Sequence, residues 1–320
     1  MDRRIFLKNS AMASLSFALS PALLEFGSFA QKLSFGIITD LHQDIMHDGP
    51  ERLDQFLSQV KKKSPDAIIQ LGDFAYPSTS NLPLIEAFNA AHPESHHVIG
   101  NHDTDSGHTK AQCLEVWGMP APYYSKVIKG VRLIVLDGNE KGSPTHQGGY
   151  ASYIGPEQVA WMEKELQDTQ EPVLILSHQP LAGVIAVDNA PEIQNILSKY
   201  ASKILLCVNG HSHIDQHLVI GQVNYLHINS ASYYWVGEDY KHPSYDASVI
   251  KDHPTIEMTC PYEDSLFAFL TIDPPAKKVT VTGRKSRWVG HSPAALGYKT
   301  EGDPSLANLV VPEIKNLRLG

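Results

Sequence analysis

Apolar runs of strand length alternate along this chain with segments that have helical spacing. A polar cluster follows each of five mainly apolar runs, at 33–39, 67–71, 97–99, 173–177 and 204–208. Continuous apolar runs bounded by polar loops are typical of strands that are buried on both faces of a parallel sheet. Residues 51–63 and 158–166 instead place apolar side chains at helical spacing, as helices do when they cover such a sheet. The alternation predicts an α/β fold.

Four further runs have strand character. They lie at 132–136, 225–228, 266–272 and 278–282. The sequence Asp273-Pro-Pro-Ala-Lys between the last two contains turn-forming residues and predicts a hairpin loop. No linker, repeat or low-complexity segment interrupts residues 31–320, so we expect a single domain over that range.

The polar clusters that follow the first five runs contain aspartate, asparagine and histidine. They are Asp40-Leu-His42, Gly72-Asp73, Gly100-Asn101-His102-Asp103, His178 and Gly210-His211-Ser212-His213. In open α/β sheets the carboxyl ends of the strands form the edge where ligands bind, so we expect these side chains to converge. Carboxylate and imidazole donors suit Zn, Fe or Mn better than Ca. The absence of cysteine from these clusters argues against a structural zinc site. The clusters therefore predict two metal ions, with Asp73 as the carboxylate that bridges them.

Each cluster has an ordinary explanation when it stands alone. An Asp-x-His after a strand is usually a turn with a solvated histidine, and Gly-Asn favours a positive φ. The joint occurrence of five clusters favours the metal site over unrelated turns. Most of the 16 histidines lie outside the clusters and are assigned to surface or core positions, and His108 is a weaker candidate for substrate contact.

These five clusters, in this order, resemble the motif set of the calcineurin-like metallophosphoesterase family, from Leu33 to about Gly283. The resemblance implies a four-layer α/β/β/α sandwich, with two mixed sheets flanked by helices. It implies that one metal ion is held by Asp40, His42, Asp73 and His213, and the other by Asp73, Asn101, His178 and His211. It also places His102 where it either faces the leaving-group oxygen as a proton donor or stabilises the charge on the phosphoryl oxygens, with Asp103 orienting and polarising its ring.

The activity implied by this resemblance is hydrolysis of a phosphodiester or pyrophosphate bond by in-line attack of a metal-activated water. A phosphomonoesterase acting at the same site is an alternative. A metal-dependent binding protein without turnover is a second alternative, and hydrolysis of a non-phosphate ester is a third. Substrate choice is expected in the loops around the metals, where Tyr233 to Trp235 either contact the substrate or complete the packing.

The amino terminus has the pattern of an export signal. Arg3 and Arg4 resemble a twin-arginine motif, an apolar stretch follows from Ala11 to Leu24, and Ser28-Phe-Ala30 suits a cleavage site. We expect residues 1–30 to be a signal peptide that engages the export machinery, and the mature protein to be periplasmic or secreted. The stretch is shorter than the roughly 20 apolar residues that span a bilayer, so a permanent membrane anchor is not expected.

The charge of the chain argues against general nucleic-acid binding. The formal net charge is −9 at pH 7. Three basic and two acidic residues give the first 30 positions a charge of +1, so residues 31–320 carry −10. A nucleic-acid-binding protein needs a basic surface to neutralise many phosphates, whereas bound metal ions can hold a small phosphate ester. A small phosphate ester is therefore the expected substrate.

Three cysteines do not make a disulfide framework. Cys207 lies inside an apolar run and is expected to be a small buried hydrophobic residue. We expect Cys113 and Cys260 to be free thiols, with a disulfide between them as the alternative in an oxidising compartment.

Overall fold

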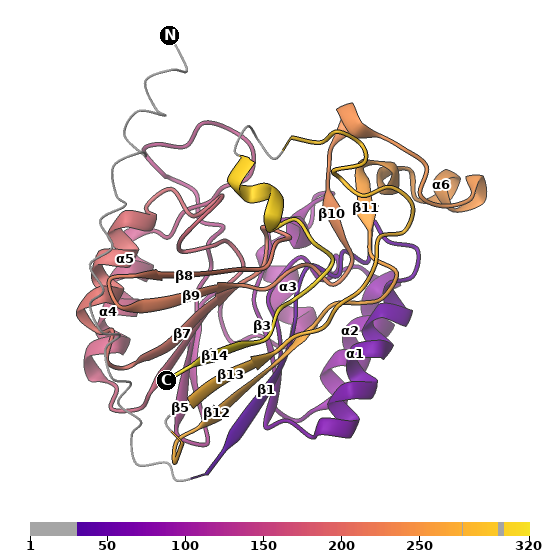
Figure 1. Cartoon of the computed structure of the whole chain (residues 1–320). Coiled ribbons are helices and arrows are strands. Elements are labelled where there is room, and N and C mark those ends of the chain that lie inside the picture. Colours follow the sequence, from indigo (N-terminus) through magenta and orange to yellow (C-terminus); the bar gives the residue numbers. More distant parts are fainter. Residues whose placement is uncertain (1–30, 277, 300–303) are drawn as a thin grey trace.

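Two six-stranded mixed β-sheets form the centre of the computed structural model, which describes residues 31–276, 278–299 and 304–320 (Figure 1). In spatial order, the first sheet consists of β14 (Leu317–Leu319), β13 (Lys278–Thr282), β12 (Ala268–Asp273), β1 (Leu33–Ile38), β2 (Ala67–Gln70) and β3 (Ser95–His97). Strands β1, β2 and β3 are parallel, whereas β12, β13 and β14 pair with antiparallel neighbours. The carboxyl ends of the three parallel strands therefore share one edge of the sheet.

The second sheet has a parallel centre and antiparallel edges. It consists, in spatial order, of β4 (Tyr124–Ile128), β5 (Val131–Val135), β6 (Val173–Ser177), β7 (Ile204–Asn209), β9 (Val223–His227) and β8 (Gln216–Ile220). Strands β5, β6, β7 and β9 are parallel, and β4 and β8 close the two edges as antiparallel strands. A separate two-stranded ribbon pairs β10 (Tyr233–Trp235) with β11 (Thr259–Pro261).

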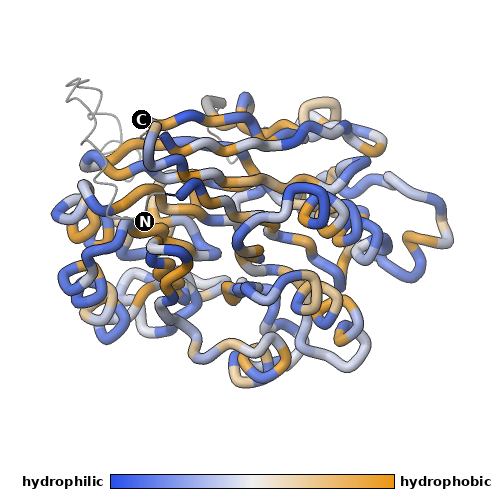
Figure 2. Tube along the Cα trace, turned by 90° about the horizontal axis from the view of Figure 1, so that it is seen from below, coloured by the Kyte–Doolittle hydropathy of each residue, from blue (hydrophilic) through white to orange (hydrophobic). Residues whose placement is uncertain are grey.

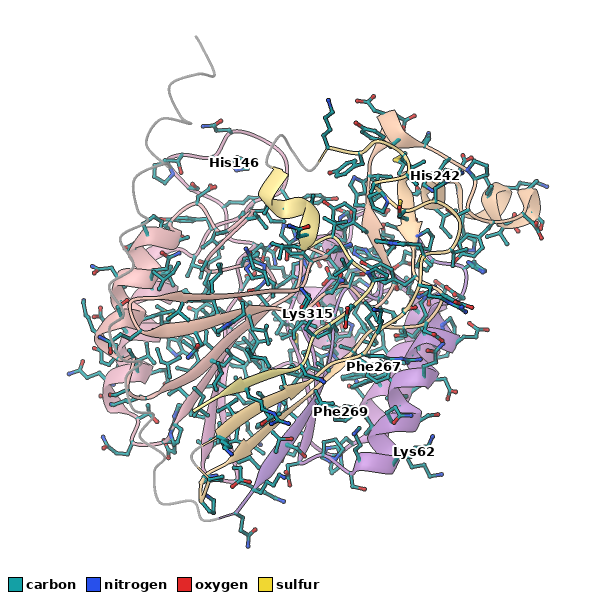
Figure 3. The ribbon with its side chains drawn as sticks, in the orientation of Figure 1. Lys62, His146, His242, Phe267, Phe269 and Lys315 are labelled. Carbon is teal, nitrogen blue, oxygen red and sulfur yellow. The ribbon has the colours of Figure 1, made fainter. Side chains whose placement is uncertain are left out.

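Helices cover the outer face of each sheet (Figure 1). The first sheet is covered by α1 (Gly49–Lys63), α2 (Leu82–Ala91) and α3 (Lys110–Trp117), and the second by α4 (Pro156–Asp168) and α5 (Ala190–Lys199). Along the chain, helix α6 (Ala247–Asp252) comes between β10 and β11. The 3-10 turns span Thr79–Asn81, His102–Thr104, Glu238–Tyr240, Pro254–Met258 and Pro304–Asn308. Phe267 and Phe269 lie on the side of the first sheet that faces α1, where their rings are 5.5 and 6.3 Å from that of Phe56 (Figure 3).

Alternation within single strands shows how the layers are built. In β6, Leu174 and Leu176 belong to the core between the two sheets, whereas Val173 and Ile175 belong to the core under α4 and α5. Successive side chains of a strand point to opposite faces, so a strand covered on both faces must be apolar at every position. This explains the continuous apolar runs, which appear as orange stretches in the hydropathy view (Figure 2).

The structure confirms the four-layer α/β/β/α sandwich with two mixed sheets. It corrects strand boundaries: β3 spans Ser95–His97 and ends before Val98 and Ile99, which were expected to belong to it, and β12 begins at Ala268 rather than Leu266. Strand β3 is short, and two of its three residues are histidines, so its composition does not mark it as a strand. Cys113, Cys207 and Cys260 are free, buried thiols, as expected.

The expected signal peptide at 1–30 lies outside the described residues. Within the described part of the chain, no helix combines the length and the apolar character needed to cross a membrane.

Candidate metal centre

The five polar clusters meet where the carboxyl ends of β1, β2, β6 and β7 and the loop after β3 come together. Their titratable side chains form two groups, and within each group the ligand atoms lie within 4.8 Å of one another. The first group is Asp40, His42 and His213, and the second is Asp73, His178 and His211. The seven side chains expected to bind metal are thus brought together, since Asn101 adjoins the second group.

In the first group, three ligand atoms point toward one another. Nε2 of His213 lies 3.2 Å from Oδ1 of Asp40 and 3.2 Å from Nε2 of His42. Burial opposes ionisation of Asp40, but His213 and His178 together outweigh it and lower the pKa of Asp40 to about 2. Burial also lowers the pKa of His42 well below its usual value, so this imidazole offers a lone pair. Two facing imidazole nitrogens and a carboxylate are a donor set that fits a transition-metal ion.

The second group is arranged around Nε2 of His178. This atom lies 3.1 Å from Oδ2 of Asp73, 3.2 Å from Nδ1 of His211 and 3.2 Å from Oδ1 of Asn101. On the other side of the ring, Nδ1 of His178 is 2.8 Å from the carbonyl oxygen of Leu71. A metal-binding histidine usually donates its second ring nitrogen to such a carbonyl, which fixes the ring and directs the other nitrogen at the metal.

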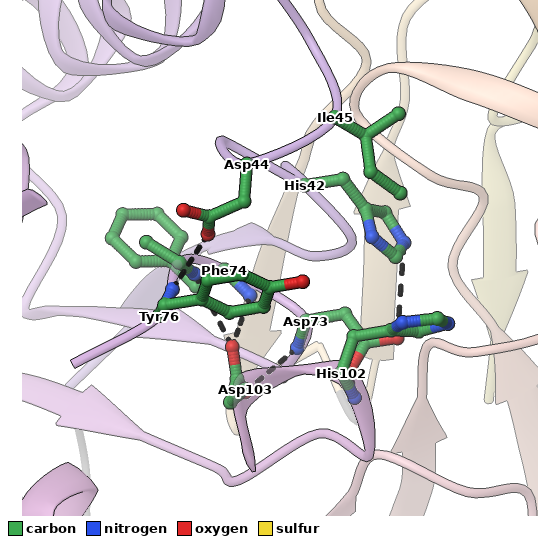
Figure 4. A pocket seen from close by; sticks show the side chains of 9 residues that line it. His42, Asp44, Ile45, Asp73, Phe74, Tyr76, His102 and Asp103 are labelled. Carbon is green, nitrogen blue, oxygen red and sulfur yellow. Dashed lines mark hydrogen bonds and ion pairs between the residues drawn. The ribbon is translucent and has the colours of Figure 1, made fainter. Parts of the chain in front are cut away.

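Asp73 lies between the two groups. Its Oδ2 is 3.1 Å from Nε2 of His178. The same oxygen is 3.7 Å from Nε2 of His42, and Oδ1 accepts the backbone N–H of His102 at 2.8 Å (Figure 4). Burial disfavours its charge, but His178 and His102 outweigh that effect and hold the pKa of Asp73 well below its usual value. One ionised carboxylate therefore faces both groups, as expected of a bridging ligand.

The backbone at these ligands adopts an unusual conformation. Positive φ angles occur at Asp40 (52°), His42 (49°), Asp73 (49°), His211 (66°) and His213 (49°). Residues other than glycine rarely adopt this left-handed region, and such strain gathers at functional sites. Gly100 allows the loops to approach, because a Cβ atom there would lie 2.1 Å from Oδ1 of Asp73. Five strained ligands in one site indicate that packing of the two sheets holds them in place.

The expected pairing of Asp103 with His102 is wrong. The Asp103 carboxylate instead accepts backbone N–H groups from Asp73 (3.0 Å), Phe74 (2.8 Å), Ala75 (3.2 Å) and Gly100 (2.7 Å). It therefore ties the loop after β2 to the loop after β3, and it supports Asp73 rather than the histidine. An aspartate could either orient His102 or accept backbone N–H groups of the loops. Only the direction of the side chain decides between these two roles.

His102 itself lies at the site, as expected. Its ring is 5.1 Å from that of His42 in an edge-to-face arrangement, and its side chain is 33% exposed, so substrate can reach it. Its Nδ1 is 2.8 Å from Oδ2 of Asp105, a residue that the sequence analysis did not select. Asp105 lies only two positions beyond Asp103, so the proximity of an acidic residue to His102 was the available signal.

His227 is a second residue that the sequence analysis missed. Its Nδ1 accepts a hydrogen bond from the Ser212 hydroxyl at 2.8 Å, and its Nε2 donates to the carbonyl oxygen of Ala182 at 2.8 Å. Because Ser212 lies between His211 and His213, this fully buried imidazole holds the loop that carries two ligands. Its position at the carboxyl end of β9, where the ligands of the other strands occur, could have identified it.

Replacing His227 with glutamine is expected to reduce the acid sensitivity of folding. Burial lowers the pKa of His227 to about 4 from its ordinary value of 6.5, so on acidification the unfolded chain takes up this proton first. The stability due to neutral His227 is complete above pH 6.5 and is lost as the pH falls toward 4. The loss amounts to about 3 kcal/mol, because one pKa unit corresponds to about 1.4 kcal/mol.

Urea unfolding at pH 7 and at pH 4 measures this effect. The difference in unfolding free energy between the two pH values should be about 3 kcal/mol smaller in His227→Gln than in the wild type. His217→Gln is the control, because His217 lies exposed on the edge strand β8. An unchanged pH dependence in His227→Gln would contradict the assignment.

The aromatic segment Tyr233 to Trp235 divides into different environments. Tyr233 is 1% exposed and packs 4.9 Å from the ring of His42 and 5.0 Å from that of His213. Tyr234 contacts the ring of Tyr298 at 5.6 Å, whereas Trp235 is 41% exposed. Tyr233 therefore packs against the first group of ligands, and Trp235 remains accessible from solvent.

Comparison with known proteins adds a family and a fold. The family model described as calcineurin-like phosphoesterase matches residues 33–215. A dimetal phosphatase from Danio rerio is similar in structure, with a TM-score of 0.53 and 14% identity over 81% of this chain and 99% of that one. GAP50, the anchor in the inner membrane complex of Plasmodium, has a TM-score of 0.54 and 11% identity over 81% of this chain and 85% of that one. No curated protein matches the chain in sequence.

Proposed function

The chain belongs to the calcineurin-like phosphoesterase family, and from this premise we propose that it hydrolyses a phosphodiester or pyrophosphate bond. The family match and the two candidate groups of metal ligands together identify the protein as a metal-dependent phosphoric ester hydrolase. The observation that carries the proposal is the position of Asp73, whose Oδ2 faces both groups of ligands. A single bridging carboxylate between two donor sets is what a two-metal phosphoesterase requires.

The proposed ligand sets follow the geometry. Asp40, His42 and His213 would hold one ion, His178, His211 and Asn101 the other, and Asp73 both. Two bound ions would stabilise the negative charge that develops on the phosphoryl oxygens and lower the pKa of a water molecule enough for it to attack phosphorus near neutral pH. The donor atoms suit Mn, Fe or Zn.

The other steps depend on the side chains of the protein. Hydrogen bonds from four backbone N–H groups to Asp103 hold the loops that position Asp73 and His102. His102 is partly exposed beside the metal groups, where its imidazole can give a proton to the departing oxygen. A proton donor matters most when the leaving group is a strong base, as the alkoxide of an unactivated ester is, so His102 supports hydrolysis of such an ester.

Substrate size and cellular location are also proposals. The charge of −10 on residues 31–320 supports a small phosphate ester held by the metals rather than a nucleic acid bound along its backbone. The twin-arginine pattern supports export, with the enzyme acting in the periplasm or outside the cell.

Turnover of matched, unactivated aryl phosphate monoesters and diesters, such as phenyl esters, by the metal-reconstituted protein tests the proposal. We expect a higher kcat/KM for the diester, and we expect His102→Ala to lower it by roughly 10²-fold or more, as loss of a general acid does. His217→Ala, which removes an exposed histidine from β8, should have no effect.

The alternatives give different results in the same assay. A preference for the monoester would make the protein a phosphatase. Two metals bound per chain without turnover of either ester would favour a binding protein and overturn the proposal.

A further inference from the structure

Two side chains outside the five clusters contact the imidazole of His102. Its Nδ1 lies 2.8 Å from Oδ2 of Asp105, and the hydroxyl of Tyr150 lies 2.7 Å from the same carboxylate oxygen. The Tyr150 hydroxyl is also 3.3 Å from Nδ1 of His102, and the two rings are 4.9 Å apart. An ionised carboxylate only accepts hydrogen bonds, so both the imidazole and the phenol donate to Asp105.

These contacts determine which nitrogen of His102 is available. Because Nδ1 donates to Asp105, Nε2 is the nitrogen left for another partner, and it has a proton to give to that partner when the ring is doubly protonated. Among the described residues, no side chain occupies Nε2 with a hydrogen bond. An imidazole held at one nitrogen and open at the other is poised to exchange a proton with a bound substrate.

Tyr150 reaches His102 from a loop between β5 and α4. The preceding Gly148 and Gly149 have φ angles of 106° and 80°, and the loop lies at the upper edge of the molecule with His146 (Figure 3). Backbone hydrogen bonds anchor the residues just after Tyr150, because Asp188 donates to Ser152 at 2.7 Å and Tyr153 donates to Gly138 at 2.8 Å. The loop therefore does not need the Tyr150 side chain as its anchor.

The Tyr150 side chain is unusually accessible for its size. It is 48% exposed, and it is one of five large apolar residues with such exposure among those described, with Val127, Ile185, Val219 and Trp235. Of these five, Tyr150 is the one that contacts His102. A hydroxyl that is bonded on the protein side leaves the remaining ring surface free to pack against a ligand.

We propose that Asp105 and Tyr150 form the leaving-group side of the site. Asp105 is a positioning residue that holds His102 with Nε2 toward the departing oxygen. Tyr150 determines specificity, because its exposed ring packs against the leaving group while its hydroxyl secures Asp105. This inference rests on the proposed function, and it names the substrate class as phosphodiesters whose leaving group carries a flat ring.

The role of Asp105 is tested with two diesters that differ only in the leaving group. One releases para-nitrophenolate, which needs little protonation, and the other releases an unactivated benzyl alcohol. In Asp105→Asn, kcat should fall roughly 10²-fold or more for the benzyl ester but less than about 10-fold for the para-nitrophenyl ester. KM should stay unchanged for both, and Asp188→Asn is the control from the neighbouring loop.

The role of Tyr150 is tested with benzyl and methyl leaving groups on the same phosphate. In Tyr150→Ala, KM should rise about 10-fold for the benzyl ester, because the stacking surface is lost, and stay unchanged for the methyl ester. Tyr150→Phe keeps the ring and should keep the KM of the benzyl ester, while its kcat falls because the hydroxyl no longer secures Asp105. Tyr200→Ala, at the residue that caps the C-terminal end of α5, serves as the control.

The outcomes separate this inference from the proposed function. Equal losses for both leaving groups in Asp105→Asn, or equal changes in KM for benzyl and methyl esters in Tyr150→Ala, would overturn the inference while the wild type still hydrolyses diesters. A wild type that binds two metals and hydrolyses no ester would overturn both.

Discussion

Asp73→Asn is expected to lose both bound metals and nearly all hydrolytic activity. The substitution keeps the size of the side chain, and its amide oxygen can still accept the backbone N–H of His102. It removes the negative charge that faces His178 at 3.1 Å and His42 at 3.7 Å. Mutation of a residue that only supports a metal ligand lowers metal affinity or activity by about 10–100-fold. Loss of a ligand shared by both ions should therefore lower them by more than roughly 100-fold.

Metal content per chain and kcat/KM, measured at the same metal concentration, provide the test. Asp66→Asn is the matched control, because Asp66 is also largely buried but lies at the start of β2, at the opposite end of that strand. There it accepts the backbone N–H of Ser34 at 2.7 Å. The length of β2 separates it from the two groups of metal ligands. Full metal content with turnover close to the wild type would show that Asp73 is not the bridging ligand.

Gly72→Ala is expected to disrupt the site through a steric clash. Gly72 has a φ of 98°, and a Cβ atom there would lie 2.5 Å from Nδ1 of His178 and 2.7 Å from the backbone N of Gly100. Both contacts are too short, so the β2 loop or the His178 ring must move. Since His178 also donates to the carbonyl of Leu71, a shift there misplaces the second group of ligands. We expect metal binding and turnover to fall by more than about 100-fold.

Gly118→Ala separates this clash from the cost of the backbone conformation. Gly118 ends α3 with a φ of 70°, and a Cβ atom there would meet nothing within 4 Å. A residue with a side chain in this conformation costs about 1–2 kcal/mol, so Gly118→Ala should lower the unfolding free energy by that amount without loss of metal. Similar metal content in Gly72→Ala and Gly118→Ala would contradict the clash.

Much of the fold could be predicted from the sequence because both sheets are covered on two faces. Strands such as β6 and β7 are buried at every position and apolar up to their last residue, so they stand out as continuous runs. Edge strands do not have that property. In β8, His217 and Val219 are exposed and the apolar run is only three residues long, and β4 likewise exposes Lys126 and Val127, so neither was predicted.

The sequence by itself determined the composition of the metal centre. Aspartate, asparagine and histidine are side chains that can bind metal ions, and the ends of parallel strands bring them to one edge, so residue type and position predicted a metal site, while the resemblance to the family supplied the two ligand sets. Asp40, His42, Asp73, Asn101, His178, His211 and His213 accordingly lie together in the structure. The composition of the site depends on which residues follow which strands, and the sequence contains that order.

Only the tertiary structure decided how the surrounding residues divide their roles. Asp103 and Asp105 both lie close to His102 in the sequence, yet Asp103 turns to backbone N–H groups of two loops and Asp105 turns to the imidazole. Tyr150 reaches the same carboxylate from 45 positions away in a polar loop. Such contacts depend on side-chain direction and on the packing of loops from different elements, and neither has a periodic pattern in the sequence.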